Sequence, residues 1–303
     1  MKYQTMFVPE RYGRLAILLM ACATSVFADP ALQLELSADK TEFILGEPVV
    51  IQVTLHNTGS QAVDVVSVFD PTYGTVRYSI TAAGGATKEF EPAWLDEYQK
   101  LPTIKLEPGQ RTTGDARLFL GANNVSFAAA GSYKINARFG KLQAAALNIK
   151  IAEPSTTAER EAAALMTHKD VAMFIFAGGG ETLVQAQTNL QKVIATAPGS
   201  LLSGYASYAL GTYYAADARD FKRNALRRAD LIKAEALFLD ALKQPLTAPF
   251  RIKAYSQAIS AAVLNKHPEV ADKYLSEFRQ AFSNDPRAMP LLKSLETTLP
   301  TRR

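Results

Sequence analysis

The spacing of apolar residues changes once along this chain, at Glu153-Pro154. Before this point apolar and polar residues alternate in short segments bounded by turn residues, which is typical of half-buried β-strands. After it apolar residues recur with helical spacing in alanine- and leucine-rich sequence. The sequence therefore predicts an α+β protein with an all-β domain over 29–153 and an all-α domain over 154–303.

Seven short segments rich in β-branched and aromatic residues make up the first half, and they favour a two-sheet β-sandwich. They are Leu32–Leu36, Val49–Leu55, Val63–Phe69, Val76–Ile80, Arg117–Leu120, Tyr133–Phe139 and Leu147–Ile151.

Three turn sequences and a tyrosine give this half a resemblance to bacterial immunoglobulin-like modules. Leu-Gly-Glu-Pro-Val at 45–49, Leu-His-Asn-Thr-Gly at 55–59 and Leu-Glu-Pro-Gly-Gln at 106–110 look like turns of such modules. Gly131-Ser-Tyr133 resembles their tyrosine corner, where a tyrosine hydroxyl bonds to upstream backbone. The resemblance implies an immunoglobulin-like sandwich and specifies the fold more than the role.

The least strand-like part of this half, residues 88–98, carries the only tryptophan, Trp94, beside four carboxylates. One interpretation is an aromatic and acidic loop that contacts a partner or a sugar. The other is a loop whose tryptophan closes the end of the sandwich. Asp96 and Glu97 are adjacent and would point to opposite faces of a strand, so they make a poor acid–base pair.

Start and stop signals divide the second half into seven helices. Thr156 and Glu159 form a capping box, and Asp285-Pro286 is a second start signal. Breaks fall at glycine and proline, as at Pro198-Gly199. The predicted helices lie near 157–176, 181–196, 200–217, 219–243, 248–265, 268–283 and 286–298, and short breaks indicate antiparallel pairs.

The helices resemble degenerate tetratricopeptide repeats. Ala209-Leu-Gly211 with Tyr214 matches the first helix of that repeat, where a small residue lets the neighbouring helix approach. The second helix and its stop are matched by Ala234, Phe238, Ala241 and Pro245, and the preceding repeat by Ala186, Leu190 and Pro198. The chain departs from the pattern because an insertion separates Tyr214 from Ala234. A third pair, 248–283, lacks a Leu-Gly pair, so an α-solenoid of another type stays open.

Two sets of residues are candidates for binding a partner in the helical half. Tyr205, Tyr208 and Thr212 share one helix face, and the resemblance would make that face the concave side of the repeat. The alternative is that the tyrosines pack between helices. Arg219, Arg223 and Arg227 are spaced four apart and would form a basic stripe on a helix, either a docking site for an anionic partner or an ordinary solvated face.

The first 28 residues resemble a secretory signal. A basic start precedes the apolar run 15–23, and Val26-Phe-Ala28 offers a cleavage site after Ala28. Leu19-Met-Ala-Cys22 gives a rival interpretation, a lipoprotein signal that leaves a lipidated Cys22. We therefore expect an exported, periplasmic protein, or alternatively an outer-membrane lipoprotein or a secreted protein. The mature chain would have no transmembrane span.

Other features point away from cofactor, metal and nucleic-acid chemistry. Residues 29–153 carry 11 Lys+Arg and 14 Asp+Glu, a net charge of −3, and residues 154–303 carry 19 and 14, a net of +5, which does not suggest nucleic acid. Gly178-Gly-Gly180 lacks the spacing of a dinucleotide loop. The three histidines are far apart in sequence and lack metal-site spacing. The sequence thus predicts no cofactor, no metal and no catalytic residue.

The sequence favours a non-catalytic binding or scaffold protein that captures a protein or peptide of the cell envelope in its helical groove. Two alternatives remain: an envelope enzyme acting on a glycan through the acidic loop 89–97, and an immunoglobulin-like protease inhibitor.

Overall fold

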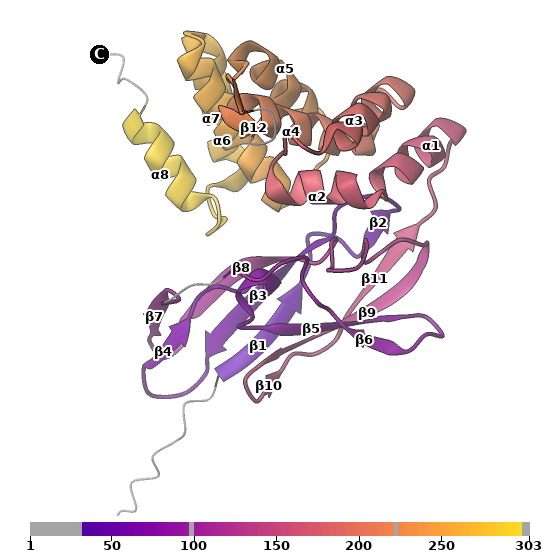
Figure 1. Cartoon of the computed structure of the whole chain (residues 1–303). Helices are drawn as coiled ribbons and strands as arrows, with labels where there is room; N and C mark the ends of the chain where they lie inside the picture. Colours follow the sequence, from indigo (N-terminus) through magenta and orange to yellow (C-terminus); the bar gives the residue numbers. More distant parts are fainter. Residues whose placement is uncertain (1–31, 97–99, 221–223, 299–303) are drawn as a thin grey trace, which may run out of the picture.

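The computed structural model describes residues 32–96, 100–220 and 224–298, with sheets in the N-terminal half and helices in the C-terminal half (Figure 1). The last large strand ends at Ala152 and the first helix begins at Thr157, so structure changes where the apolar spacing changes. The predicted signal sequence over 1–28, with Cys22, and the predicted partner residue Arg223 lie outside the described residues.

The described part of the N-terminal half contains eleven strands and one short 3-10 helix. They are β1 (Leu32–Ser37), β2 (Glu42–Ile44), β3 (Val50–Asn57), β4 (Val63–Val66), the 3-10 helix Pro71–Tyr73, β5 (Arg77–Ala82), β6 (Thr87–Glu89), β7 (Thr103–Leu106), β8 (Arg111–Arg117), β9 (Gly131–Phe139), β10 (Leu142–Gln143) and β11 (Leu147–Ala152).

Two main sheets share one apolar core. One sheet has the order β1-β3-β8 and the other β2-β11-β9-β5-β6, while β4 and β7 pair separately. In β9 the alternate residues Tyr133, Ile135 and Ala137 are buried in this core, whereas Ser132 and Lys134 are exposed. This alternation confirms the predicted period of two in β9.

The predicted strand at 117–120 is wrong, because the strand in this region, β8, is Arg111–Arg117 and ends where the prediction begins. Its residues are mostly polar, and only Ala116 is buried, since β8 lies at the edge of its sheet beside β3. An edge strand needs no apolar alternation, so the sequence gives little sign of it. Four strands, β2, β6, β7 and β10, were not predicted because each has only two to four residues, too few to show a pattern.

Tyr133 makes the hydrogen bond that its resemblance to a tyrosine corner implies. Its hydroxyl donates to the carbonyl oxygen of Ala129, four residues upstream, at 2.8 Å. Its ring packs edge-on against Phe127, with ring centroids 5.1 Å apart. The bond and the ring contact together fasten the loop that enters β9 to the core.

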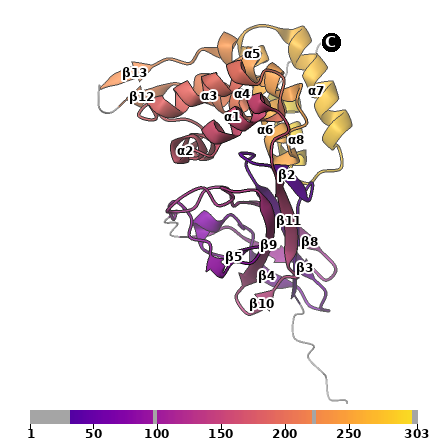
Figure 2. The ribbon, with the colours of Figure 1, turned by 90° about the vertical axis from the view of Figure 1, so that its right-hand side faces the viewer.

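The C-terminal half is a stack of helices with one small hairpin between them (Figures 1 and 2). Its elements are α1 (Thr157–Met166), α2 (Lys169–Ala177), α3 (Val184–Thr196), α4 (Leu201–Ala215), β12 (Ala218–Asp220), β13 (Ala225–Arg227), α5 (Leu231–Leu242), α6 (Ala248–Leu264), α7 (Pro268–Phe282) and α8 (Met289–Thr298). Helices adjacent in sequence pack against each other from α3 through α7.

Local signals place several of these helices as the sequence predicts. The Thr156 hydroxyl accepts from the Glu159 amide and the Glu159 carboxylate accepts from the Thr156 amide, so the capping box is formed. Gly211 lets α5 approach α4, because a Cβ at this position would lie 2.8 Å from the Phe238 ring. The close approach expected at Ala209-Leu-Gly211 is therefore present.

Two predicted helices differ from the structure. The helix predicted at 157–176 is divided into α1 and α2 at Thr167 and His168, where the His168 ring caps α2 by accepting from the Asp170 amide. The helix predicted at 219–243 begins only at Leu231, because β12 and β13 form an antiparallel hairpin before it.

The two halves share a core at their junction. Val50 and Phe119 of the β-rich half are buried in the same apolar cluster as α1 to α6. The turn before β3 enters the helical half: a Cβ on Gly46 would lie 2.9 Å from the Met166 Cβ and 3.1 Å from the Ala163 Cα. Gly46 also has a φ of +88°, so both its conformation and its surroundings require glycine. The helices therefore sit directly on the end of the sheets (Figure 2).

Candidate functional site

A cavity of about 600 Å³ lies at the junction of the β-rich and helical halves. Its walls come from β3, β8, the 3-10 helix, α2, α4, α6 and α8. The lining residues are Val50, Asp70, Tyr73, Asp115, Arg117, Phe119, Ile175, Phe176, Ala177, Gly178, Tyr208, Thr212, Pro249, Phe250, Lys253, Ser256, Gln257 and Leu291. The volume falls within the range of small-molecule sites, and the junction of two parts of a chain is a common place for one.

Helical periodicity explains which residues of the helical half reach the cavity. Phe250, Lys253 and Gln257 of α6 recur at three- and four-residue spacing and lie on one face of that helix. Tyr208 and Thr212 do the same on α4. One face of each helix therefore supplies both apolar and polar groups to the same space.

Buried aromatic rings form the apolar wall of the cavity. Phe119 and Phe176 come from different halves, and their centroids lie 5.7 Å apart. Tyr208 and Phe250 meet edge to face at 5.3 Å. All four side chains are buried, so neighbouring side chains fix the rings before any ligand enters.

Asp70 and Arg117 form a closed ion pair in the wall. The Arg117 Nε donates to an Asp70 carboxylate oxygen at 2.7 Å, and the Thr72 hydroxyl donates to the other oxygen at 2.8 Å. The Arg117 Nη1 donates to the Phe176 carbonyl oxygen at 3.1 Å, and its guanidinium carbon lies 3.8 Å from the centre of the Phe176 ring. Both charges are thus engaged by the protein itself.

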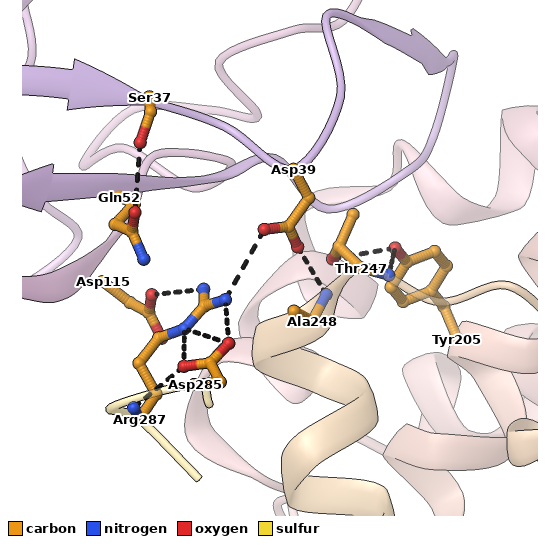
Figure 3. Close-up of polar contacts among 9 residues, drawn as sticks. All are labelled: Ser37, Asp39, Gln52, Asp115, Tyr205, Thr247, Ala248, Asp285 and Arg287. Carbon is orange, nitrogen blue, oxygen red and sulfur yellow. Dashed lines mark hydrogen bonds and ion pairs between the residues drawn. The ribbon is translucent and has the colours of Figure 1, made fainter. Parts of the chain in front are cut away.

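Asp115 is held by Arg287, which comes from the segment between α7 and α8 (Figure 3). The Arg287 Nη1 lies 3.2 Å from the Asp115 carboxylate and Nη2 lies 2.6 Å from that of Asp285, while Asp39 is 3.6 Å away. Burial raises the pKa of Asp115, although the charge and hydrogen bond of Arg287 oppose the rise. One arginine therefore joins carboxylates from both halves of the chain.

Lys253 is the cation of the cavity that has no counterion. Among the described residues, its ammonium has no hydrogen bond and no ion pair. The side chain is exposed to solvent, yet enough protein surrounds it that desolvation, followed by the charge of Arg117, lowers its pKa. The charges of Asp115 and Asp70 oppose that shift. Lys253 is therefore available to a ligand.

Tyr205 does not face a groove, and the prediction of its exposure is wrong. The ring is fully buried. The hydroxyl donates to the Glu47 carboxylate at 2.9 Å and accepts from the Thr247 amide at 3.1 Å, and Figure 3 shows the bond to Thr247. Burial, followed by the charge of Glu47, raises the pKa of this hydroxyl well above its usual value. Tyr205 thus joins the halves and contacts no partner from solution.

Tyr208 and Thr212 line the cavity, although they do not lie on an open concave face. Tyr208 is buried with 7% of its surface exposed, and burial raises the pKa of its hydroxyl to about 12. The Thr212 hydroxyl oxygen lies 2.9 Å from the Gln257 side-chain oxygen and 3.0 Å from the Tyr208 carbonyl oxygen. The shared helix face was predicted, and the structure turns that face toward the junction.

The predicted basic stripe does not exist as a helix face. Arg219 pairs with Leu226 and Arg227 with Ala218 across the β12–β13 hairpin, so the two arginines point to opposite faces. Arg227 donates to the Glu181 carboxylate and lies 3.9 Å from the centre of the Tyr213 ring. Arg219 donates to the Asn224 side chain at 2.6 Å. Both arginines are engaged within the chain.

Trp94 packs at the junction of the halves. Its ring meets Phe176 of α2 edge to face, with centroids 4.5 Å apart. The packing interpretation of this tryptophan therefore holds, but the ring covers a helix and not only the end of the sheets. In the same loop Glu91 is exposed and Asp96 is partly buried.

Metal clusters and membrane-spanning helices are both absent from residues 32–96, 100–220 and 224–298. Within these ranges no cluster of three or more histidine, cysteine or acidic residues has the arrangement of a metal site. His267 pairs with the buried Glu235 at 3.0 Å, and His168 caps α2. No helix of the same ranges has both the length and the apolar character needed to cross a bilayer.

Sequence reasoning missed Arg117, Lys253 and the two phenylalanines Phe119 and Phe176. They come from segments distant in sequence, and no local motif connects them. A weak signal was available for one of them: Lys253 is a charged residue on the face of α6 that also carries Phe250.

Comparisons with known proteins give limited information. No family model matches the chain, and a search of curated proteins found no match. Solved structures with local likeness include a β-glucosidase from Erythrobacter marinus (16% identity, TM-score 0.27), an alkylpurine DNA glycosylase from Pseudomonas fluorescens (17%, 0.28) and a sporulation control protein from Bacillus subtilis (10%, 0.24). They cover 41%, 41% and 45% of this chain, which spans 16%, 31% and 54% of theirs, less than two thirds in each case. Likenesses at these TM-scores support no conclusion on function.

Proposed function

We propose that this chain is a non-catalytic binding protein that holds its ligand in the cavity between the β-rich and helical halves. The observation that carries the proposal is that both halves of the chain contribute side chains to the wall of the cavity. Phe119 of one half and Phe250 of the other supply fixed aromatic surface, and Lys253 supplies a cation with no internal partner. The carboxylates Asp70 and Asp115 are each held by an arginine, which favours binding over acid–base chemistry.

A blocked cavity tests this function. Ser256 lines the cavity from α6, and Ser260 lies one turn further along the same helix, exposed and outside the lining. We expect a thermal-shift screen of organic acids, peptides and sugars to find ligands that stabilise the wild-type chain and the Ser260→Phe control but not Ser256→Phe. Equal stabilisation of both variants would place the ligand elsewhere and overturn the proposal, as would the absence of any ligand for the wild type.

The cellular setting belongs to the same proposal. The signal-like first 28 residues support export to the periplasm, where the ligand would be a peptide end or a small molecule of the cell envelope. The hydrogen bond of Tyr133 supports an immunoglobulin-like origin for the sheets, and the close approach at Gly211 supports a tetratricopeptide-like origin for the helices. Fractionation of cells that carry a tagged full-length chain tests the location, and recovery in the cytoplasm alone would contradict it.

A second candidate function rests on two ionisable groups, Asp115 and Lys253, that line the same cavity. Burial raises the pKa of Asp115 and lowers that of Lys253, and such divergent pairs occur in acid–base enzymes. Mass spectrometry of a bound ligand after prolonged incubation with the wild-type chain separates the two functions. Conversion of the ligand, abolished by Asp115→Asn, would establish catalysis, and recovery of the unchanged ligand supports binding alone.

A further inference from the structure

We propose that the cavity at the junction selects a molecule with a single carboxylate next to an aromatic or aliphatic body, and that Lys253 binds the carboxylate. This inference rests on the proposed function and names its ligand class. Three observations support it: the ion pairs among the charged residues of the cavity, the hydrogen bonds that Arg117 already makes, and the aromatic residues in the rest of the wall.

The lining holds two carboxylates, Asp70 and Asp115, and two cations, Arg117 and Lys253, and of these four Lys253 is the one without an ion pair among the described residues. Asp70 is paired with Arg117 at 2.7 Å, and Asp115 is paired with Arg287 at 3.2 Å. Lys253 has no counterion in the part of the chain that the structure describes. A single negative charge on the ligand would give Lys253 the partner it lacks. A second negative charge would instead meet the carboxylates of Asp70 and Asp115, so a monoanion fits and a dianion does not.

The charge of the ligand favours a carboxylate over a phosphate, because a phosphate monoester carries about 1.5 to 2 negative charges at neutral pH and a carboxylate carries one. Arginine binds either group with a planar fork that donates two parallel hydrogen bonds. Arg117 already donates to Asp70 and to the Phe176 carbonyl oxygen, and its face is stacked on the Phe176 ring. Lys253 offers the single compact charge of an ammonium group in place of a guanidinium, and a single charge suits a ligand group that carries one negative charge.

The wall next to Lys253 requires an apolar body on the ligand. Phe250 precedes Lys253 by three residues on α6, so the two side chains lie on the same face of the helix. Tyr208 meets Phe250 edge to face, and Phe119 and Phe176 complete the aromatic surface. A small hydrophilic anion such as acetate would leave these rings in contact with water, whereas an attached ring or alkyl chain would cover them.

The polar groups around Lys253 support a carboxylate at this place. Gln257 lies one turn further along α6 and Tyr208 belongs to the neighbouring helix α4, and both residues line the cavity. The pKa of Lys253 is lowered because desolvation and the charge of Arg117 outweigh the opposing charges of Asp115 and Asp70. A bound carboxylate would raise that pKa again, so the ligand and the protonated lysine stabilise each other.

Matched acids and amides test the inference on the full-length mature chain. The probes are 3-phenylpropionate, acetyl-Gly-Phe with a free carboxylate, and decanoate, each compared by calorimetry with its uncharged amide. Lys253→Met removes the charge and keeps most of the stem. Lys192→Met is the control, because Lys192 of α3 is exposed and lies outside the cavity lining. We expect at least one acid to bind the wild type and the control about tenfold more tightly than its amide.

In Lys253→Met the acid should fall to the affinity of its amide while the amide is unchanged. A preserved preference for the acid in this variant, or equal binding of acid and amide to the wild type, would overturn the ligand class but leave the proposed function standing. Failure of every acid and amide, together with a wild type that no other ligand stabilises, would overturn both. The acid that binds most tightly identifies the source as a free aromatic acid, a peptide end or a fatty acid.

Discussion

Arg287 is the residue whose removal should most directly loosen the junction of the two halves. Its side chain is 14% exposed and contacts the carboxylates of Asp285, Asp115 and Asp39, whose side chains are 17%, 27% and 30% exposed. Arg287→Met keeps the apolar stem and removes every ion pair at once. Three partly buried carboxylates then lose the cation that they share.

The expected cost follows from the burial of these carboxylates. Removing one partner of a fully buried ion pair costs about 3–5 kcal/mol, and partial exposure of the aspartates reduces this to about 2–3 kcal/mol. Arg279→Met is the matched control, because Arg279 pairs with Glu296 at 2.8 Å but both side chains are about half exposed. An exposed pair of this kind contributes at most about 0.5–1 kcal/mol.

The pH dependence has a definite sign. Burial raises the pKa of Asp115 even with Arg287 present, so its ionised form destabilises the fold above that pKa, and the cost is relieved as the pH falls. Burial alone would raise the pKa of Asp285, but hydrogen bonds from Arg287 outweigh it and lower the pKa. The resulting stability is present at neutral pH and lost in acid. Because of both effects, Arg287→Met should lower the free energy of unfolding most near neutral pH and less in acid.

Urea unfolding followed by two signals is the assay. Trp94 is the only tryptophan and packs on Phe176 at the junction, so its fluorescence reports on the junction, while circular dichroism reports on the helices. We expect Arg287→Met to lower the urea midpoint by about 0.5–1 M at neutral pH and by less at about pH 4. The tryptophan transition should move at least as far as the helical one. A variant as stable as Arg279→Met, or a difference that grows in acid, would refute the reasoning.

Three further substitutions probe other parts of the fold, each measured by urea unfolding against the wild type. Tyr205→Phe should cost about 1–3 kcal/mol, because the buried Glu47 carboxylate loses a donor and a buried amide loses its acceptor. No loss of stability would mean that the hydroxyl does not join the halves. Gly211→Ala should cost about 1–3 kcal/mol although alanine favours helices, since its Cβ would lie 2.8 Å from Phe238. A gain in stability would contradict the close approach. Thr156→Ala should cost about 1 kcal/mol by removing one side of a capping box, and an unchanged midpoint would show that α1 does not depend on it.

Sequence patterns predicted the division of the chain because the relevant signals are local. The alternation in β9, the capping box at Thr156 and the helix start at Ser200 each depend on neighbouring residues. The hairpin before α5 could not be predicted in this way. Its sequence has helical composition, but Asn224 takes a φ of +47° and Arg227 finds Glu181, which is distant in sequence. Tertiary contacts decide the structure there.

The burial of the tyrosines of α4 could have been predicted from the lack of charged residues around them. Tyr205, Tyr208 and Thr212 do lie on one helix, yet every residue from Leu202 to Gly211 is buried. The sequence from Val193 to Ala216 contains no charged residue, and a helix without a polar face is expected to be buried on all sides. That absence of charge argued for packing of Tyr205 and against an open groove. The cavity itself joins segments too far apart for any local pattern to indicate it.

The turn that enters the helical half has a consequence for synthesis. The Glu47 carboxylate, fully buried in the finished chain, receives its bond from Tyr205 only after another 158 residues have been made. Until then the turn that carries Glu47 has no helices to pack against. Val50 and Phe119 also lack the helices that bury them. A nascent chain that stops before α4 therefore exposes the apolar side chains of Val50 and Phe119 near the Glu47 carboxylate. Chaperones bind intermediates with exposed apolar surface of this kind.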